Sequence, residues 1–246
     1  MIGKDELVKI AKLNGLKNWQ QERHYVQSVA LLALSDYPVV FKGGTYLWFF
    51  HGLDRFSEDL DFTSNGALPD DLDSRVSEAL GMYGIENKSR IEMKDGRTFS
   101  FRISARGPLN TSEIDVSHVY VEISRREAVL KKPLALKLDL PAYQAPTKII
   151  SGMDLGEVAA EKVRAMLTRS KARDAYDMFF LLNKGIKPEL GMVNEKLKYY
   201  EKSFSKEEFT ERIAKTGKDW KRELGPLIFG ELPDFETVEK RLLEAF

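Results

Sequence analysis

The sequence predicts an α+β protein in which a sheet flanked by helices is followed by a C-terminal helical region. Strand-like runs, either apolar or alternating, are confined to residues 39–140. Two amphipathic helical segments precede these runs, and from residue 155 onward the apolar periodicity is helical. Separation of strands from a later run of helices is typical of α+β proteins or of two adjoining domains.

Composition excludes several classes of protein. The 246 residues are 43% hydrophobic and 31% charged, which is the balance of a soluble globular protein. The absence of cysteine excludes disulfides and cysteine-based zinc or nucleophile sites. No long apolar run or signal-peptide pattern occurs, so we expect a cytoplasmic protein without a membrane partner. The 38 basic and 38 acidic residues cancel, so nucleic-acid binding would require a local patch.

Two helices are predicted before the first strand, over residues 4–14 and 19–35, with Asn18 as the N-cap of the second. We expect both to cover one face of the sheet. The residues predicted to face the core are Leu7, Ile10 and Ala11 in the first helix and Trp19, Val26, Val29, Ala30 and Ala33 in the second.

A glycine turn follows the first predicted strand, Val39–Phe41. Gly43 and Gly44 allow a positive φ or a close approach of the backbone to a ligand. Thr45 is the predicted N-cap of a helix that begins at Tyr46. Unpaired N–H groups at a helix start bind anions, so a triphosphate could lie here, although an ordinary structural turn has the same pattern.

Two aspartates then alternate with apolar residues. Because Leu60 and Phe62 are expected to face the core, Asp59 and Asp61 point together to the other side of the strand. Hard cations such as Mg²⁺ or Mn²⁺ relieve the repulsion between such carboxylates and bind through one or two of them plus substrate phosphates. An Asp-x-Asp pattern also occurs by chance, but its place after a glycine turn and a short helix favours a metal site.

The next predicted elements extend the sheet. They are a helix from Pro69-Asp70 to about Gly81, a hairpin of residues 90–93 and 98–103 across Asp95-Gly96, and strands over residues 119–124 and 134–140. In strand 119–124, Glu122 lies on the face opposite the core and is a candidate third carboxylate, or an ordinary exposed glutamate. Asp115 competes with it. Pro141–Pro146 is the predicted boundary between domains of residues 1–145 and 146–246.

Helices are predicted over residues 155–168 and 173–183. Asp177 follows Lys162 by 15 positions, which in one unbroken helix would separate them by roughly 22 Å. If both serve one site, the helix must break near Thr168–Ala172, and a continuous helix would contradict that function. Further on, lysines interleaved with aromatics could contact RNA or coat an ordinary amphipathic helix: Lys196, Lys198, Lys202 and Lys206 with Tyr199, Tyr200, Phe204 and Phe209.

Together these motifs resemble a known family. Gly44-Thr45 followed after thirteen residues by Asp59-Leu-Asp-Phe62 resembles the polymerase-β-like nucleotidyltransferase superfamily, which implies a mixed sheet. The blocks KGGT…RFSEDLDF, VEISRRE and AAEKVRAMLTRSKARDAYD are similar to the AbiEii nucleotidyltransferase toxins of abortive-infection and toxin–antitoxin systems. Relatives of these toxins modify the 3′ end of tRNA. The likeness spans roughly residues 20–240.

The resemblance implies roles for individual residues. The triphosphate would be held by Gly43, Gly44, Thr45, Ser57 and Arg55, the last as a structural or phosphate-binding arginine. Asp59 and Asp61 would bind the metal, with Glu122 as a further ligand. Lys162 would neutralise the phosphates from the helical domain, which completes the active-site cleft. One of Asp174 and Asp177 would be essential, and the helical geometry favours Asp177.

The expected function is Mg²⁺-dependent transfer of NMP from an NTP to an acceptor, namely an RNA (tRNA) 3′ end. A cognate antitoxin is an expected partner. Two alternatives remain: transfer of NMP to a protein side chain, and a catalytically silent binding protein. A Walker-type NTPase is disfavoured because the chain has no Gly-x-x-x-x-Gly-Lys-Ser/Thr motif.

Overall fold

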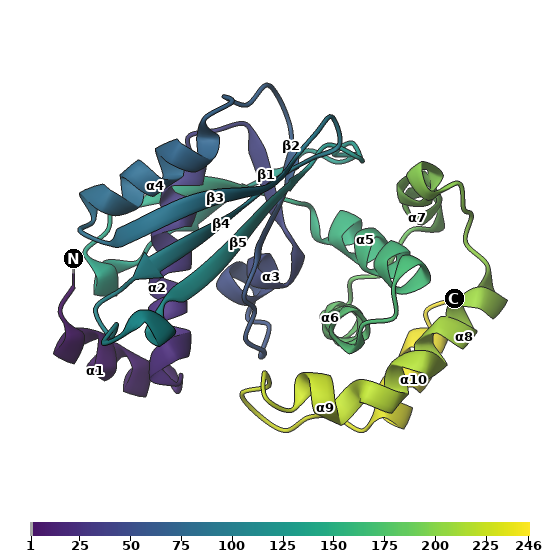
Figure 1. The fold of residues 1–246 in the computed structure, drawn as a ribbon. Coiled ribbons are helices and arrows are strands. Elements are labelled where there is room, and N and C mark those ends of the chain that lie inside the picture. Colours follow the sequence, from purple (N-terminus) through teal and green to yellow (C-terminus); the bar gives the residue numbers. More distant parts are fainter. Residues whose placement is uncertain (1) are drawn as a thin grey trace. The chain divides into compact units, whose positions relative to one another are not determined.

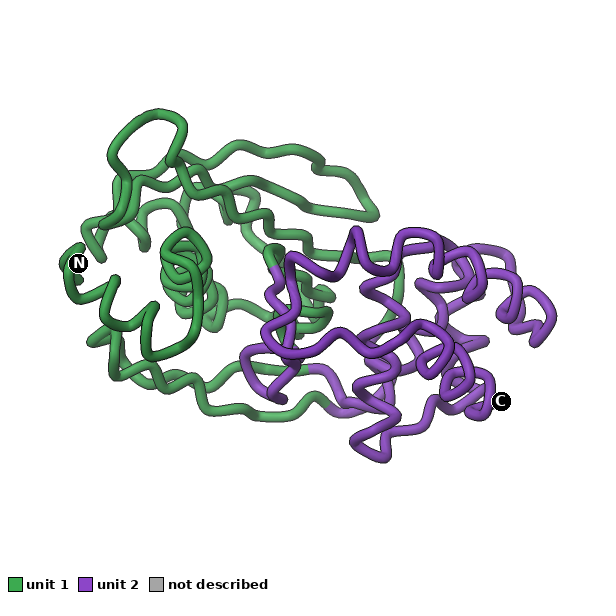
Figure 2. The backbone as a smooth tube through the Cα atoms, turned by 90° about the horizontal axis from the view of Figure 1, so that it is seen from below, with its two compact units in different colours: residues 1–46, 58–128, 133–152 green, residues 47–57, 129–132, 153–246 purple. Residues whose placement is uncertain are grey.

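The computed structural model describes residues 2–246, which form two compact units (Figure 2). The first unit contains the chain up to Tyr46 together with Glu58–Ala128 and Pro133–Gly152. The second contains Leu47–Ser57, Val129–Lys132 and Met153–Phe246. Residues 146–152, which follow the predicted domain boundary, therefore belong to the first unit, and two short earlier segments belong to the second.

The first unit is built on a mixed sheet whose strand order is β3-β4-β5-β2-β1-β7-β6 (Figure 1). Its strands are β1 (Val39–Lys42), β2 (Leu60–Ser64), β3 (Glu86–Lys94), β4 (Thr98–Arg106), β5 (Ser117–Ser124), β6 (Leu134–Leu138) and β7 (Lys148–Gly152). The pairs β2–β5 and β1–β7 are parallel, and the remaining pairs are antiparallel. The predicted α+β class is confirmed.

Three helices accompany this sheet: α1 (Lys4–Asn14), α2 (Asn18–Leu34) and α4 (Leu72–Met82). Their apolar faces are buried as the periodicity predicts, including Leu7, Val26 and Leu80. Three details differ from the prediction. Ala33, which was predicted to face the core, is only half-buried. Asn18 is the first residue of α2 and not its cap, and Trp19 is 46% exposed because it lies in the first turn of the helix.

The glycine turn is tighter than predicted. Helix α3 (Gly43–His51) begins directly after β1, so Thr45 lies inside its first turn and is not the N-cap. Gly43 has a φ of +81°, a conformation that only glycine adopts at no steric cost. The prediction of a positive φ is thus confirmed at the first glycine of the pair.

The hairpin is longer than predicted, and one strand was missed. The strands β3 and β4 are nine residues long each and form eight registered pairs, with a bulge between Ile91 and Met93. The strand β7 lies between β6 and β1, in a stretch between the predicted Pro141–Pro146 connection and the predicted helix 155–168, where no element was predicted. It is five residues long and has no clear alternation in its sequence, KIISG, so periodicity could not identify it. The predicted strand 134–140 ends at Leu138.

The second unit is mostly helical, as predicted. Its α-helices are α5 (Leu155–Thr168), α6 (Ala172–Asn183), α7 (Leu190–Leu197), α8 (Lys206–Thr216), α9 (Trp220–Leu224) and α10 (Phe235–Leu243). The predicted break is confirmed, because α5 ends at Thr168 and α6 begins at Ala172. Arg169, between them, has an extended backbone. Within residues 2–246, we find no helix that is both long and apolar enough to span a membrane.

Candidate functional site

Asp61 and Glu122, two of the predicted carboxylates of the first unit, lie in one row across the sheet. Asp61 is in register with Lys42 of β1 on one side and with Glu122 of β5 on the other. Registered neighbours present their side chains on the same face, so Glu122 lies beside Asp61. Leu60 and Phe62 are buried, whereas Asp59 and Asp61 are partly exposed, as the alternation predicted.

Gly43 is fixed by two constraints that coincide. Besides its positive φ, a Cβ added there would lie 2.5 Å from Oδ2 of Asp61 and 3.0 Å from its Cβ. The backbone at the start of α3 therefore approaches the Asp61 side chain more closely than any other residue type allows. This places the N–H groups at the start of the helix next to the predicted metal ligand.

Hydrogen bonds hold the segment before β2. The hydroxyl of Thr45 donates to the carbonyl oxygen of Asp59. Nε2 of Gln27 donates to the carbonyl oxygen of Glu58 at 2.9 Å, and Arg23 forms an ion pair with the Glu58 carboxylate. Thr45 therefore orients the backbone that carries Asp59. The sequence predicted a contact of Thr45 with a triphosphate but not this structural role.

Glu122 forms an ion pair with Arg126, four residues later. In the part of the chain that the structure describes, no three acidic or histidine side chains are grouped closely enough to hold a metal ion. Strand register thus places Glu122 beside Asp61. Glu122 does not, however, form a three-ligand cluster with the two aspartates. The competing Asp115 accepts hydrogen bonds from Thr111 and Ser112 of its own loop.

The predicted residues of the second unit form a buried ionic cluster. Asp177 accepts two bonds from Arg55, from Nε at 2.6 Å and Nη2 at 2.7 Å, and its Oδ2 lies 2.6 Å from Nζ of Lys162. Nζ of Lys162 also lies 3.2 Å from Oδ1 of Asp174. Arg169, in the break between α5 and α6, donates to both Asp174 oxygens. The helix break thus brings Lys162 to both aspartates, which a straight helix would prevent.

Both aspartates of this cluster are held in the ionised form. Burial raises the pKa of Asp177, but the adjacent Arg55 and Lys162 outweigh it and hold the pKa below the usual range. Burial likewise opposes ionisation of Asp174, and Lys162 and Arg169 again lower its pKa. In this cluster three cationic groups, those of Arg55, Lys162 and Arg169, face the two carboxylates.

Arg55 is only 2% exposed, and Nη1 also donates to the Phe56 carbonyl oxygen. The sequence left two roles open for Arg55, a structural one and a phosphate-binding one. This geometry favours the structural role. The surrounding segment is tied to the C-terminal region of the same unit, since Phe56 N donates to Leu227 O at 2.8 Å and Phe229 N donates to Asp54 O at 3.0 Å. Ser57, which follows, is partly exposed.

The lysine-rich stretch does not form one basic surface. Lys196 is buried and lies 2.6 Å from Glu157 and 3.1 Å from Glu161. Lys198 pairs with Glu195. Further along, Phe204 and Phe209 contact each other and Phe246. The stretch therefore serves mainly the internal packing of the second unit.

Sequence reasoning missed several partners of the predicted residues. They are Arg23 for Glu58, Arg126 for Glu122 and Arg169 for Asp174. Arg126 follows Glu122 by four positions and Arg169 precedes Asp174 by five, so opposite charge at short spacing was an available signal. No comparable signal links Arg23 to Glu58, because 35 positions separate them.

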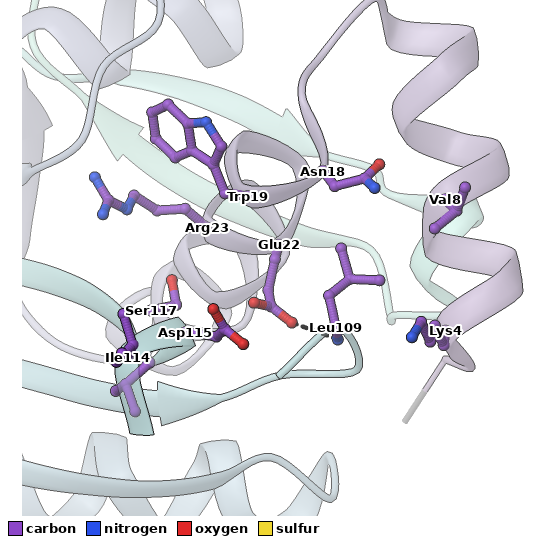
Figure 3. A pocket seen from close by; sticks show the side chains of 11 residues that line it. Lys4, Val8, Asn18, Trp19, Glu22, Arg23, Leu109, Ile114, Asp115 and Ser117 are labelled. Atoms are coloured by element: carbon purple, nitrogen blue, oxygen red, sulfur yellow. Dashed lines mark hydrogen bonds between the residues drawn. The ribbon is translucent and has the colours of Figure 1, made fainter. Parts of the chain in front are cut away.

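A pocket of about 480 Å³ lies elsewhere in the first unit (Figure 3). It is formed by α1, the start of α2 and the loop before β5, and its lining includes Trp19, Glu22, Arg23 and Asp115. Glu22 accepts a 2.6 Å hydrogen bond from Leu109 N, drawn dashed in Figure 3. None of the predicted site residues lines this pocket except the competing Asp115.

Comparison with known proteins identifies the family. The family model described as nucleotidyl transferase AbiEii toxin, Type IV TA system, matches residues 28–241. The chain belongs to this AbiEii toxin family. It is therefore a nucleotidyltransferase of a toxin family, and an NTP is its substrate. Among curated proteins, no sequence matches the chain.

Solved structures share the fold of this AbiEii protein. JHP933 from Helicobacter pylori has a TM-score of 0.59 and 21% identity, over 94% of this chain and 91% of that one. MenT4, a nucleotidyltransferase toxin from Mycobacterium tuberculosis, has a TM-score of 0.55 and 19% identity, over 93% and 83% of the two chains. At these identities the likeness concerns the fold alone.

Proposed function

We propose that this AbiEii protein transfers NMP from an NTP to the 3′ end of an RNA, with Asp59 and Asp61 as metal ligands. The observation that carries the proposal is the arrangement at the start of β2, where two partly exposed carboxylates flank the buried Leu60. Gly43, at the start of α3, approaches the second carboxylate closely enough to exclude any side chain.

The donors at this place fit a hard divalent cation. Mg²⁺ commonly binds through one or two carboxylates and takes its remaining oxygen ligands from water and substrate phosphates. Asp59 and Asp61 supply the carboxylates, which would explain the missing third protein ligand. When bound, the metal would supply positive charge to the reacting phosphate. Mn²⁺, which also prefers oxygen ligands, would fit the same donors.

In the proposed reaction, the acceptor hydroxyl oxygen forms a bond to the α-phosphorus as the bond to pyrophosphate breaks. N–H groups of Gly44 and Thr45 at the start of α3 would orient the phosphates. The hydroxyl proton requires an acceptor. We assign this role to Glu122, which is partly exposed and lies beside Asp61. Asp177 is unsuited to it, because Arg55 and Lys162 lower its pKa, so its carboxylate has little affinity for a proton.

Lys162 is proposed to contribute positive charge as pyrophosphate forms. Its ammonium group contacts Asp174 and Asp177, which hold it in one place. The two aspartates are thus proposed as positioning residues. Lys162→Met would then lower kcat, and added salt would not restore it. A wild-type kcat in this variant would remove Lys162 from the mechanism.

The proposal is tested by replacing Asp59 with asparagine, which keeps the size of the side chain and removes its charge. NMP transfer should fall by about a hundredfold or more, because several kcal/mol of charge stabilisation are lost. Asp115→Asn, an exposed aspartate on a loop, is the matched control and should retain activity. Equal activity of the Asp59 and Asp115 variants, at unchanged thermal stability, would refute the assigned site.

A further inference from the structure

The side of the β3-β4-β5 sheet that carries Glu122 is open and has a distinct chemistry. Phe99, Phe101 and Ile103 of β4 are fully buried on the other side, so the alternate residues of this strand point outward. Arg102 is in register with Arg90 of β3 and Tyr120 of β5. We call Lys88, Arg90, Arg102, His118 and Tyr120 the outer face.

The outer face adjoins the predicted catalytic row directly. Tyr120 precedes Glu122 by two residues on β5, so the two side chains lie on the same side of the sheet. Glu122 is in register with Asp61. Two residues along a strand span about 7 Å, so the row of Tyr120 lies next to the row of the carboxylates. A polymer bound along the outer face would therefore reach Asp61.

Two arginine–aromatic pairs lie in the first unit, one on the outer face and one at the start of α2. The Arg102 guanidinium lies 5.9 Å from the centre of the Tyr120 ring, and that of Arg23 lies 5.3 Å from the Trp19 ring. Figure 3 shows Trp19 and Arg23 side by side at the start of α2. His118, on the outer face, has a pKa lowered by burial and then by the positive charges of Arg102 and Arg23.

The hydrogen-bonding capacity of Arg102 is unused. Among the described residues it has no hydrogen-bond partner, and its nearest carboxylate, Glu92, lies at 3.5 Å and also faces Arg90 at 4.0 Å. One carboxylate therefore serves two arginines, while Tyr120 is 43% exposed. A guanidinium that makes no hydrogen bond and stands beside an exposed aromatic ring is suited to phosphates and stacked bases.

We propose that the outer face, with Trp19 and Arg23, binds the single-stranded end of the nucleic acid that receives the nucleotide. Tyr120 and Trp19 would stack on bases, and Arg90, Arg102 and Lys88 would contact phosphates. This inference rests on the proposed function, which supplies the RNA acceptor, and it adds the surface that binds that RNA. It would also explain how a protein of zero net charge binds a polyanion, because Lys88, Arg90 and Arg102 gather on one side of the sheet through strand register.

The test measures binding of a fluorescein-labelled, mixed-sequence, 15-nucleotide single-stranded RNA by anisotropy, without NTP. Tyr120→Ala should weaken binding by about fivefold or more, since a base stacked on an aromatic ring contributes at least this factor. Tyr120→Phe, which keeps the ring, should bind as the wild type does. Arg102→Gln should reduce the slope of log K against log salt by about 0.7, the value for one phosphate contact on a single strand.

The matched control is Tyr199→Ala, because Tyr199 is 39% exposed and lies in the lysine-rich stretch of the second unit. The Tyr199→Ala variant should bind the labelled RNA as tightly as the wild type does. Loss of binding in Tyr199→Ala with full binding in Tyr120→Ala would overturn the proposal, as would equal binding by all variants.

Transfer kinetics separate this inference from the proposed function. Tyr120→Ala should raise KM for RNA and leave KM for NTP unchanged, whereas Asp59→Asn should abolish transfer and still bind RNA. If Asp59→Asn abolishes transfer and Tyr120→Ala changes neither binding nor KM, the outer face is wrong and the chemistry stands. If wild-type protein labels protein and not RNA, the acceptor in the proposed function is wrong, and the outer face fails with it.

Discussion

At the scale of single residues, Gly43 links the fold to the chemistry most directly. Its positive φ and its closeness to Asp61 are separate demands on one position. The sequence indicated a need for glycine but not its cause, because the contact with Asp61 depends on the pairing of β1 with β2. Of the glycine pair, only Gly43 has a positive φ.

Gly43→Ala should therefore lose activity as well as stability. The substituted Cβ would displace the Asp61 carboxylate, and the left-handed backbone conformation would cost about 1–2 kcal/mol. Gly185→Ala is the matched control, since Gly185 has a φ of +79° but an added Cβ would have no atom within 4 Å. Urea unfolding and the transfer rate should show both variants destabilised and only Gly43→Ala inactive. Two equally active variants would show that the contact with Asp61 is dispensable.

His24 makes a pH-dependent contribution to stability. Burial lowers its pKa to about 4, and its Nδ1 lies 2.5 Å from the Tyr143 hydroxyl. In the unfolded chain, the same imidazole takes up a proton below its ordinary pKa of about 6.5. The unfolded state thus binds more protons as the pH falls, so the folded state loses stability between about pH 6.5 and pH 4.

From the size of this shift, we expect a loss of roughly 3 kcal/mol across that range. Urea midpoints measured at several pH values should show it in the wild type and in His118→Gln, where His24 is intact. His24→Gln should have a clearly flatter profile. A profile in His24→Gln as steep as in the wild type would assign the acid sensitivity to other groups.

At the scale of secondary-structure elements, the break between α5 and α6 determines the ionic cluster. The break was predicted on the condition that Lys162 and Asp177 serve one site, because one unbroken helix would separate them by roughly 22 Å. The same reasoning could not predict β7, which is held by pairing with β1 and β6 and not by its own pattern. Nor could it predict the start of α3, where the strand passes into the helix without a capping residue.

The two aspartates on α6 should differ in their effect on stability. Asp177→Asn leaves Arg55 buried without its charged partner, and removing one member of a buried ion pair costs about 3–5 kcal/mol. Asp174→Asn should cost less, about 1–3 kcal/mol, because the side chain of its partner Arg169 is 52% exposed and can turn to water. Unfolding in urea would measure the difference. Equal losses would contradict the role of Arg55 as the buried anchor.

At the scale of the whole molecule, the family and fold class were predictable from motif order, whereas many partners were not. Lys196 pairs with Glu157, 39 positions earlier, so a lysine that appeared to belong to a basic surface is buried. The outer face was equally hidden, because Arg90, Arg102 and Tyr120 come together only through strand register. Local patterns predict elements, while pairing across distant segments determines which charges remain exposed.

The central claim is that the protein transfers nucleotide to RNA and that Asp59 and Asp61 are the metal ligands of this reaction. The most direct measurement incubates the protein and its Asp61→Asn variant with each α-³²P-labelled NTP and total RNA, then treats the products with ribonuclease or protease. We predict that the wild type gives ribonuclease-sensitive, protease-resistant label with at least one NTP, and that the variant gives about a hundredfold less. Equal labelling by the two proteins, or label that only protease removes, would contradict the account.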